Sequence, residues 1–163
     1  MTPETPNSIT SASIRRLRRG PLAGLILALT LAPALCAWAA DSGLERRPSP
    51  AGANVYIIAP AAGETVSSPV RVQFGLQGMG VAPAGVEKAG TGHHHLLIDT
   101  DLPANLSVPI AADDQHRHFG GGQTETVLEL SPGKHTLQLL LGDERHIPLD
   151  PPVMSEKIEI LVE

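Results

Sequence analysis

Histidine is the residue type with the most distinctive chemistry in this chain. All seven histidines lie after residue 92, and four of them form two His-x-His pairs, His93/His95 and His116/His118. Alternate side chains of a strand share a face, and a rise of about 3.3 Å per residue separates them by roughly 6.6 Å. Two imidazoles can lean across that gap to one ion, with bonds of about 2.0–2.1 Å. The two pairs therefore predict a metal site formed by His93, His95, His116 and His118.

The ligand type limits the choice of metal to copper(II) or zinc. Imidazole suits both ions, and the usual order of affinities favours copper where it is available. Clustered Met residues, typical of Cu(I) sites, are absent, since the chain has 3 Met in all. His94, His135 and Asp99 are secondary candidates, the carboxylate either as a ligand or as an acceptor that orients an imidazole.

Structural interpretations compete with metal binding at the remaining histidines. His135 is in phase with Leu137, Leu139 and Leu141, which favours a hydrogen-bonded histidine at the edge of the core. His94 is in phase with Leu96 and Ile98, so a packed core role and a ligand role are equally compatible with its position. His146 precedes Ile147-Pro148 in a polar loop, where we expect a solvated side chain.

Short β-strands must position these residues. Val70, Val72, Phe74 and Leu76 alternate with more polar residues and glycine, as in a half-buried strand. Further strands are predicted at 55–58, 93–99, 124–130, 135–141 and 158–162. The Pro-Gly turn at 131–134 predicts a hairpin between the fourth and fifth of these six strands. Helical periodicity is absent, so we predict an all-β fold, a single antiparallel immunoglobulin-like β-sandwich, with a small β-barrel as the alternative.

The first residues have the order of parts of a secretory signal peptide. Arg15, Arg16, Arg18 and Arg19 precede an apolar run over 22–35, and Ala37-Trp38-Ala39 provides the small residues of a cleavage site. We predict a signal peptide over 1–39, a flexible linker over 40–53 and the domain over 54–163. The predicted location is the periplasm or the exterior, without a stable membrane anchor. The general secretory and twin-arginine routes both remain open.

Composition after the predicted cleavage excludes several functions. Four of the 12 Lys and Arg and one of the 17 Asp and Glu lie in residues 1–39, so 8 basic and 16 acidic residues remain. Such an acidic domain is unsuited to nucleic acid, which rewards clustered positive charge. The one cysteine, Cys36, would be removed, and with it any disulfide or thiolate ligand.

Three segments resemble a bacterial family of exported domains of unknown function. Its typical positions are matched by a GHHHLLID segment, a GGQTE segment and a PGxHTLQL segment. The matching residues are His93, His94, His95, Asp99, Gly121, Gly122, Gln123, Thr124, Glu125, Gly133, His135, Gly142 and Asp143. The resemblance extends over about residues 55–162 and implies export and a single β domain, but no mechanism.

Two classes of function follow from the sequence. The first is binding of Cu(II) or Zn(II) for storage, delivery or resistance. The alternative is a non-catalytic immunoglobulin-like module that docks an envelope protein, which rests on fold class alone. Catalysis is the less favoured class, because no nucleophile motif surrounds any serine, and no catalytic residue is assigned.

Overall fold

The structure is a computed structural model that describes residues 44–163. The predicted signal peptide, with its cleavage site near Ala39, lies outside these residues. The described part is all β, without a helix, and so contains none long and apolar enough to span a membrane. Its strands are β1 (Asn54–Ala59), β2 (Thr65–Val66), β3 (Val70–Gln77), β4 (Gly80–Val81), β5 (Thr91–Ile98), β6 (His116–His118), β7 (Glu125–Leu128), β8 (Gly133–Gly142) and β9 (Ile158–Val162).

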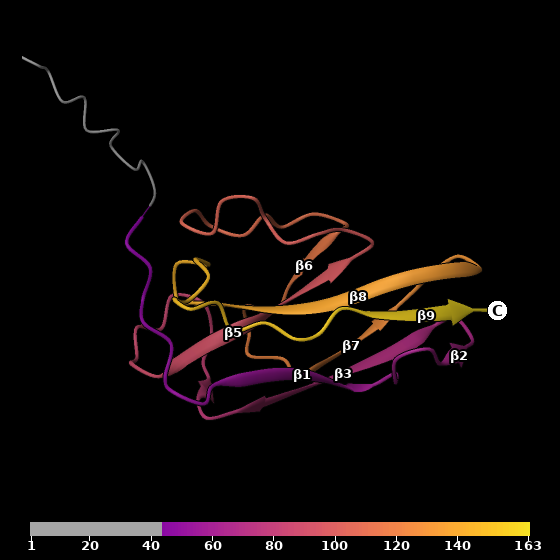
Figure 1. The fold of residues 1–163 in the computed structure, drawn as a ribbon, viewed down its shortest axis with the longest axis horizontal. Helices are drawn as coiled ribbons and strands as arrows, with labels where there is room; N and C mark the ends of the chain where they lie inside the picture. The colour runs from indigo at the N-terminus through magenta and orange to yellow at the C-terminus, as the bar shows by residue number, and fades with distance from the viewer. Residues whose placement is uncertain (1–43) are drawn as a thin grey trace, which may run out of the picture. The chain divides into compact units, whose positions relative to one another are not determined.

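Two sheets face each other, as Figure 1 shows. The smaller has the order β1-β3-β7 and is antiparallel throughout. The larger has the order β2-β9-β8-β5-β4, and β6 pairs with β5 off this path. Its central pairs are antiparallel, whereas the short β2 and β4 pair in parallel with β9 and β5. The larger sheet is therefore mixed, unlike the purely antiparallel arrangement predicted from the sequence, whereas the smaller sheet agrees with it.

The main core lies between the two sheets. β3 contributes Val72 and Phe74, β5 contributes Leu96, and β8 contributes Leu137 and Leu139, all buried. The period-two pattern of β3 thus places its apolar residues inward, as predicted. Neither sheet closes on itself, which is consistent with a β-sandwich; the immunoglobulin-like assignment within that class remains a prediction.

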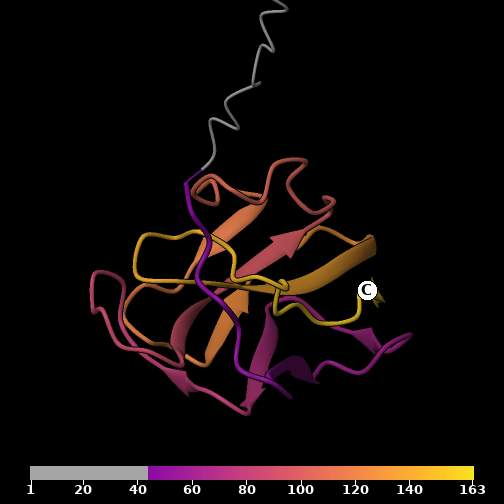
Figure 2. The same ribbon diagram turned by 60° about the vertical axis from the view of Figure 1, so that its left-hand side comes forward.

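The predicted hairpin at the Pro-Gly turn is wrong. The flanking strands both form, but β7 pairs with β3 in the smaller sheet, whereas β8 pairs with β5 and β9 in the larger one. The turn therefore carries the chain from one layer to the other (Figure 2). Leu128 and Leu137 on either side of it both reach the core between the sheets. Turn residues specify where the chain reverses, but not whether the reversed strand pairs with its predecessor.

The outer face of the larger sheet is also partly covered. Leu97 of β5 and Leu140 of β8 form a second apolar cluster with Ile110 and Leu102, which belong to the long loop after β5. β5 is consequently buried on both faces along most of its length. Polar residues on its outer face are thereby removed from water.

Residues 44–50, part of the predicted linker, run along the domain. The backbone of Ser49 and Arg47 exchanges hydrogen bonds with Asp150, and Leu44 donates to the carbonyl of Ser107. The Arg47 guanidinium pairs with Glu144 and Glu87. The predicted linker therefore contacts the domain beside the loop that follows β8.

Candidate metal centre

The three histidines of strand β5 lie on two different faces of the larger sheet. His94, Leu96 and Ile98 point into the core, where the His94 ring lies 5.2 Å from that of Phe74. His93 and His95 point to the outer face, the face of Leu97. All three histidines have no exposed surface. The alternation of a strand therefore separates His94 from the other two and sends it into the core.

Strand β6 brings a third histidine to the outer face. It pairs with β5 in antiparallel register, and His118 lies opposite His95. The ring centres of His93, His95 and His118 are 4.8, 5.0 and 5.1 Å apart. Each residue offers a ring nitrogen such that these atoms lie within 4.8 Å of one another. Three of the four histidines predicted as ligands therefore converge.

His116, the fourth predicted ligand, does not join this group. It lies opposite Leu97, two residue pairs further along the strands, and its Nδ1 is 2.9 Å from Oδ1 of Asp113. The cross-strand register explains the difference. The i, i+2 spacing places His116 and His118 on one face, but only His118 is opposite a histidine.

His146, which we expected to be solvated, lies against the cluster instead. Its ring centre is 5.0 Å from that of His93 and 4.7 Å from that of His118. Its backbone has a φ of 70°, a left-handed conformation that is uncommon for a residue other than glycine. The sequence carried no signal for this contact, because His146 follows the end of β8 in a loop without strand periodicity.

A buried carboxylate shapes the loop that carries His146. Asp143 is fully buried, and its Oδ1 accepts hydrogen bonds from the backbone N–H groups of Arg145 and Ile147, at 2.8 and 3.0 Å. The Arg145 guanidinium pairs with the other oxygen. The His146 carbonyl accepts a hydrogen bond from the Ile110 N–H. The position of His146 is therefore fixed by its neighbours on both sides.

Glycines leave the space that the imidazoles occupy. A Cβ atom on Gly142, the residue paired with His93, would lie 2.8 Å from Cε1 of His95 and 3.2 Å from Cα of His146. A Cβ atom on Gly120 would lie 2.3 Å from Cε1 of His118. The separations of 2.8 Å and 2.3 Å are shorter than real Cβ contacts, so a neighbouring group would have to shift. The cluster therefore depends on the absence of a side chain at two positions.

One loop ties the two flanking segments together. After β4, the Ala84 N–H donates to the carbonyl of Gly120, and the Gly85 N–H donates to the carbonyl of Glu144, both at 2.9 Å. Gly120 follows His118 closely, and Glu144 precedes His146. The loop thus bridges the segment after β6 and the loop after β8.

Burial makes the inner imidazoles neutral and leaves their nitrogens free. Both ring nitrogens of His93 and His95 are buried and have no hydrogen-bond partner in the described residues. Burial, together with nearby His146 and His118, lowers the pKa of His93 to about 4. Burial and, to a smaller extent, the nearby His93 lower the pKa of His95 to about 2. Burial also lowers the pKa of His118, the exposed member of the group. At neutral pH these rings can offer lone pairs without first losing a proton.

The other secondary candidates lie elsewhere and are satisfied. His135 Nδ1 is 2.7 Å from Oδ2 of Asp99, and its Nε2 is 2.9 Å from the Ser131 carbonyl oxygen. Oδ1 of Asp99 accepts the Thr136 N–H. Burial alone would lower the pKa of His135, but its hydrogen bonds to Asp99 and Ser131 outweigh burial and raise it. This pair is the hydrogen-bonded histidine at the core edge that the phase of β8 predicted.

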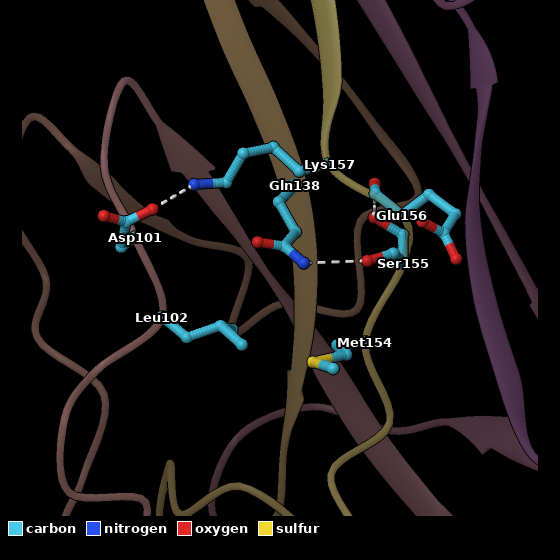
Figure 3. A pocket seen from close by; sticks show the side chains of 7 residues that line it. All are labelled: Asp101, Leu102, Gln138, Met154, Ser155, Glu156 and Lys157. Carbon is cyan, nitrogen blue, oxygen red and sulfur yellow. Dashed lines mark hydrogen bonds and ion pairs between the residues drawn. The ribbon is translucent and has the colours of Figure 1, made fainter.

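The described surface also contains a pocket of about 480 Å³ without histidine (Figure 3). Its polar groups are mostly paired with one another. Lys157 contacts the carboxylate of Asp101, and the Gln138 amide donates to the Ser155 carbonyl. The pocket is open and lacks convergent unpaired groups, so the histidine cluster is the stronger candidate for a binding site.

The fold and the cluster define an all-β domain with a group of three imidazoles, two buried and one exposed, that could hold a metal ion. The chain belongs to a family described as a domain of unknown function (DUF4399), whose model matches residues 72–163, more than half of the chain. No curated protein and no solved structure matches the chain. The matched range contains every histidine.

Proposed function

We propose that this protein binds a divalent transition metal, Cu(II) or Zn(II), through His93, His95 and His118. The observation that carries the proposal is the convergence of three ring nitrogens, two of them on fully buried side chains without partners. A buried imidazole nitrogen without a hydrogen bond is costly to the fold, about 1–3 kcal/mol each. A bound cation would satisfy one nitrogen of each ring, and the exposed His118 gives it a path from solvent.

The chemistry of the donors matches these ions. Zinc and copper(II) are both commonly held by neutral imidazole nitrogens. The rigid pairing of β5 with β6 and β8 preorganises the ligands, so little ordering remains for the metal to impose. No thiolate is present in residues 44–163 to compete.

We further propose that the protein works outside the cytoplasm, after cleavage near Ala39, in metal storage, delivery or resistance. The basic, apolar and small-residue segments of 1–39 support export. Determining the first residue of protein recovered from an envelope fraction tests the cleavage.

The alternative role, docking of an envelope protein, has less support. Tyr56 and Val127 are exposed on the outer face of the smaller sheet. An ion pair between Arg71 of β3 and Glu125 of β7 lies on that same face. A face divided by an ion pair is not a continuous apolar patch, and such patches mark docking surfaces.

A metal titration tests the proposal. The apo protein is titrated with Zn(II) and with Cu(II), beside a His93→Ala/His95→Ala variant and a His93→Gln/His95→Gln variant that retains side-chain volume. We expect one ion per chain in the native protein and an affinity no tighter than about millimolar in both variants. A His116→Gln control should bind as the native protein does. Equal binding by the native protein and a folded double variant would contradict the proposal.

A further inference from the structure

The four clustered rings have a definite shape. The separations of the ring centres of His93, His95, His118 and His146 all lie between 4.7 and 6.0 Å. Four points with nearly equal separations form a tetrahedron. In a square, by contrast, the two diagonal separations are about 1.4 times longer than the four separations along the edges.

The observed distances favour the tetrahedron. The longest, 6.0 Å, joins His95 and His146, but the opposite pair, His93 and His118, is separated by only 5.0 Å. With metal–nitrogen bonds of about 2.0–2.1 Å and about 1.1 Å from nitrogen to ring centre, tetrahedral imidazoles would have centres about 5.2 Å apart. Five of the six separations fall between 4.7 and 5.1 Å. The cluster therefore has the size and the shape of a four-imidazole tetrahedral site.

The surrounding residues hold the backbone of His146 in place beside the cluster. The left-handed φ of 70° would suit glycine better than histidine, and strained backbone of this kind concentrates at functional sites. Asp143 and the Ile110 N–H hold the loop, and Gly142 leaves the room beside His95. His146 is outside the group whose nitrogens lie within 4.8 Å, so its side chain has to turn to become a ligand.

We infer that His146 is the fourth ligand of a tetrahedral Zn(II) site completed by His93, His95 and His118. The inference rests on the proposed function and adds the metal and its geometry. Zn(II) takes four tetrahedral ligands in closed sites, whereas Cu(II) prefers tetragonal arrangements and Cu(I) selects sulfur ligands. Four protein ligands leave no position for water, so the site holds an ion for storage or delivery and does not activate water for hydrolysis.

The central experiment is to remove the His146 imidazole and then restore it. His146→Gly is the suitable variant because glycine accepts the left-handed backbone, and His116→Gln is the matched control. We expect Zn(II) affinity to fall by more than the about 10- to 100-fold typical of losing an outer hydrogen-bond partner of a ligand. Added imidazole should restore affinity in His146→Gly and leave the native protein unchanged. Thermal unfolding of the apo forms checks that the variant is folded.

Spectroscopy provides a second readout. Co(II) in the native site should give the intense visible bands of a four-coordinate ion, unchanged with pH. In His146→Gly, the spectrum should change with pH because water takes the vacated position. X-ray absorption of bound zinc should show four imidazoles in the native protein and three in the variant.

The outcomes separate this inference from the proposed function. If the His93/His95 variants lose the metal but His146→Gly retains native affinity and spectrum, His146 is not a ligand and only this inference is overturned. A tetragonal Cu(II) spectrum with a Cu(II) preference that His146→Gly leaves unchanged would overturn it as well. If the native protein binds neither ion, the proposed function itself fails.

Discussion

The two His-x-His pairs have the same spacing and lie on adjacent strands, but they differ in what surrounds them. His93 and His95 are on β5, which has neighbours on both sides and a covered outer face, so both rings are buried without partners. On the edge strand β6, His118 faces the cluster while His116 contacts Asp113. Spacing places two side chains on one face, and the neighbouring strand then determines whether both meet the same partner.

Substituting the glycine that packs beside each His-x-His pair is the strongest test of this difference between a buried pair and an edge pair. In Gly142→Ala, the new Cβ meets the buried His95 ring and the backbone of His146. We expect a loss of stability of about 1–3 kcal/mol, typical of overpacking, together with at least about a tenfold loss of zinc affinity. Urea unfolding of the apo protein and zinc titration measure the two effects.

Gly120→Ala is the counterpart on the second pair. Its Cβ meets the end of the His118 side chain, which is exposed and can swing outward. Zinc affinity should therefore fall while the stability of the apo protein changes by less than about 0.5 kcal/mol. Equal losses of stability in the two alanine variants would remove the distinction between a buried pair and an edge pair.

Replacing a buried histidine by leucine tests whether the first pair is present for binding. His95→Leu removes two buried nitrogens without partners at similar side-chain volume. We expect the apo variant to be more stable than the native apo protein by about 1–3 kcal/mol, and zinc to give it no further stability. Chemical unfolding with and without zinc measures both. A destabilised apo variant would indicate that the imidazole is a structural part of the core.

His135, which has hydrogen-bond partners, should stabilise the fold, in contrast to the buried His95 without partners. The raised pKa of His135 means that its pairing with Asp99 stabilises the fold fully below the unfolded pKa of about 6.5, and that this contribution is lost as pH rises through the folded pKa. Asp99→Asn keeps an acceptor for Thr136 and tolerates the positive φ of 54°, but removes the charge.

Its effect on stability is expected to be smaller than the effects of Gly142→Ala and His95→Leu. Asp99 is 42% exposed, so solvent screening limits the loss to at most about 1 kcal/mol. The difference in unfolding free energy between native and variant should be present near pH 5.5 and shrink by about pH 8. A difference that grows with pH would contradict the assignment.

Much of this protein was determined by its sequence alone. The period-two pattern of Val70, Val72 and Phe74 specified a strand and its inward face, because burial of alternate side chains is a local property. The same rule placed His93 and His95 on one face and His94 on the other, but it left open whether His94 packs in the core or acts as a ligand. The hydrogen-bonded role of His135 also followed from its phase with the leucines of β8.

Tertiary structure decided which elements meet. The register of β6 against β5 selected His118 over His116, and the layer change at the Pro-Gly turn sent β7 and β8 to different sheets. His146 could be placed only by the fold, since its ring meets His93 of β5 and His118 of β6, and its carbonyl accepts the N–H of the distant Ile110. Local periodicity reports the face on which a side chain lies, whereas contacts between distant segments depend on the packing of the whole domain.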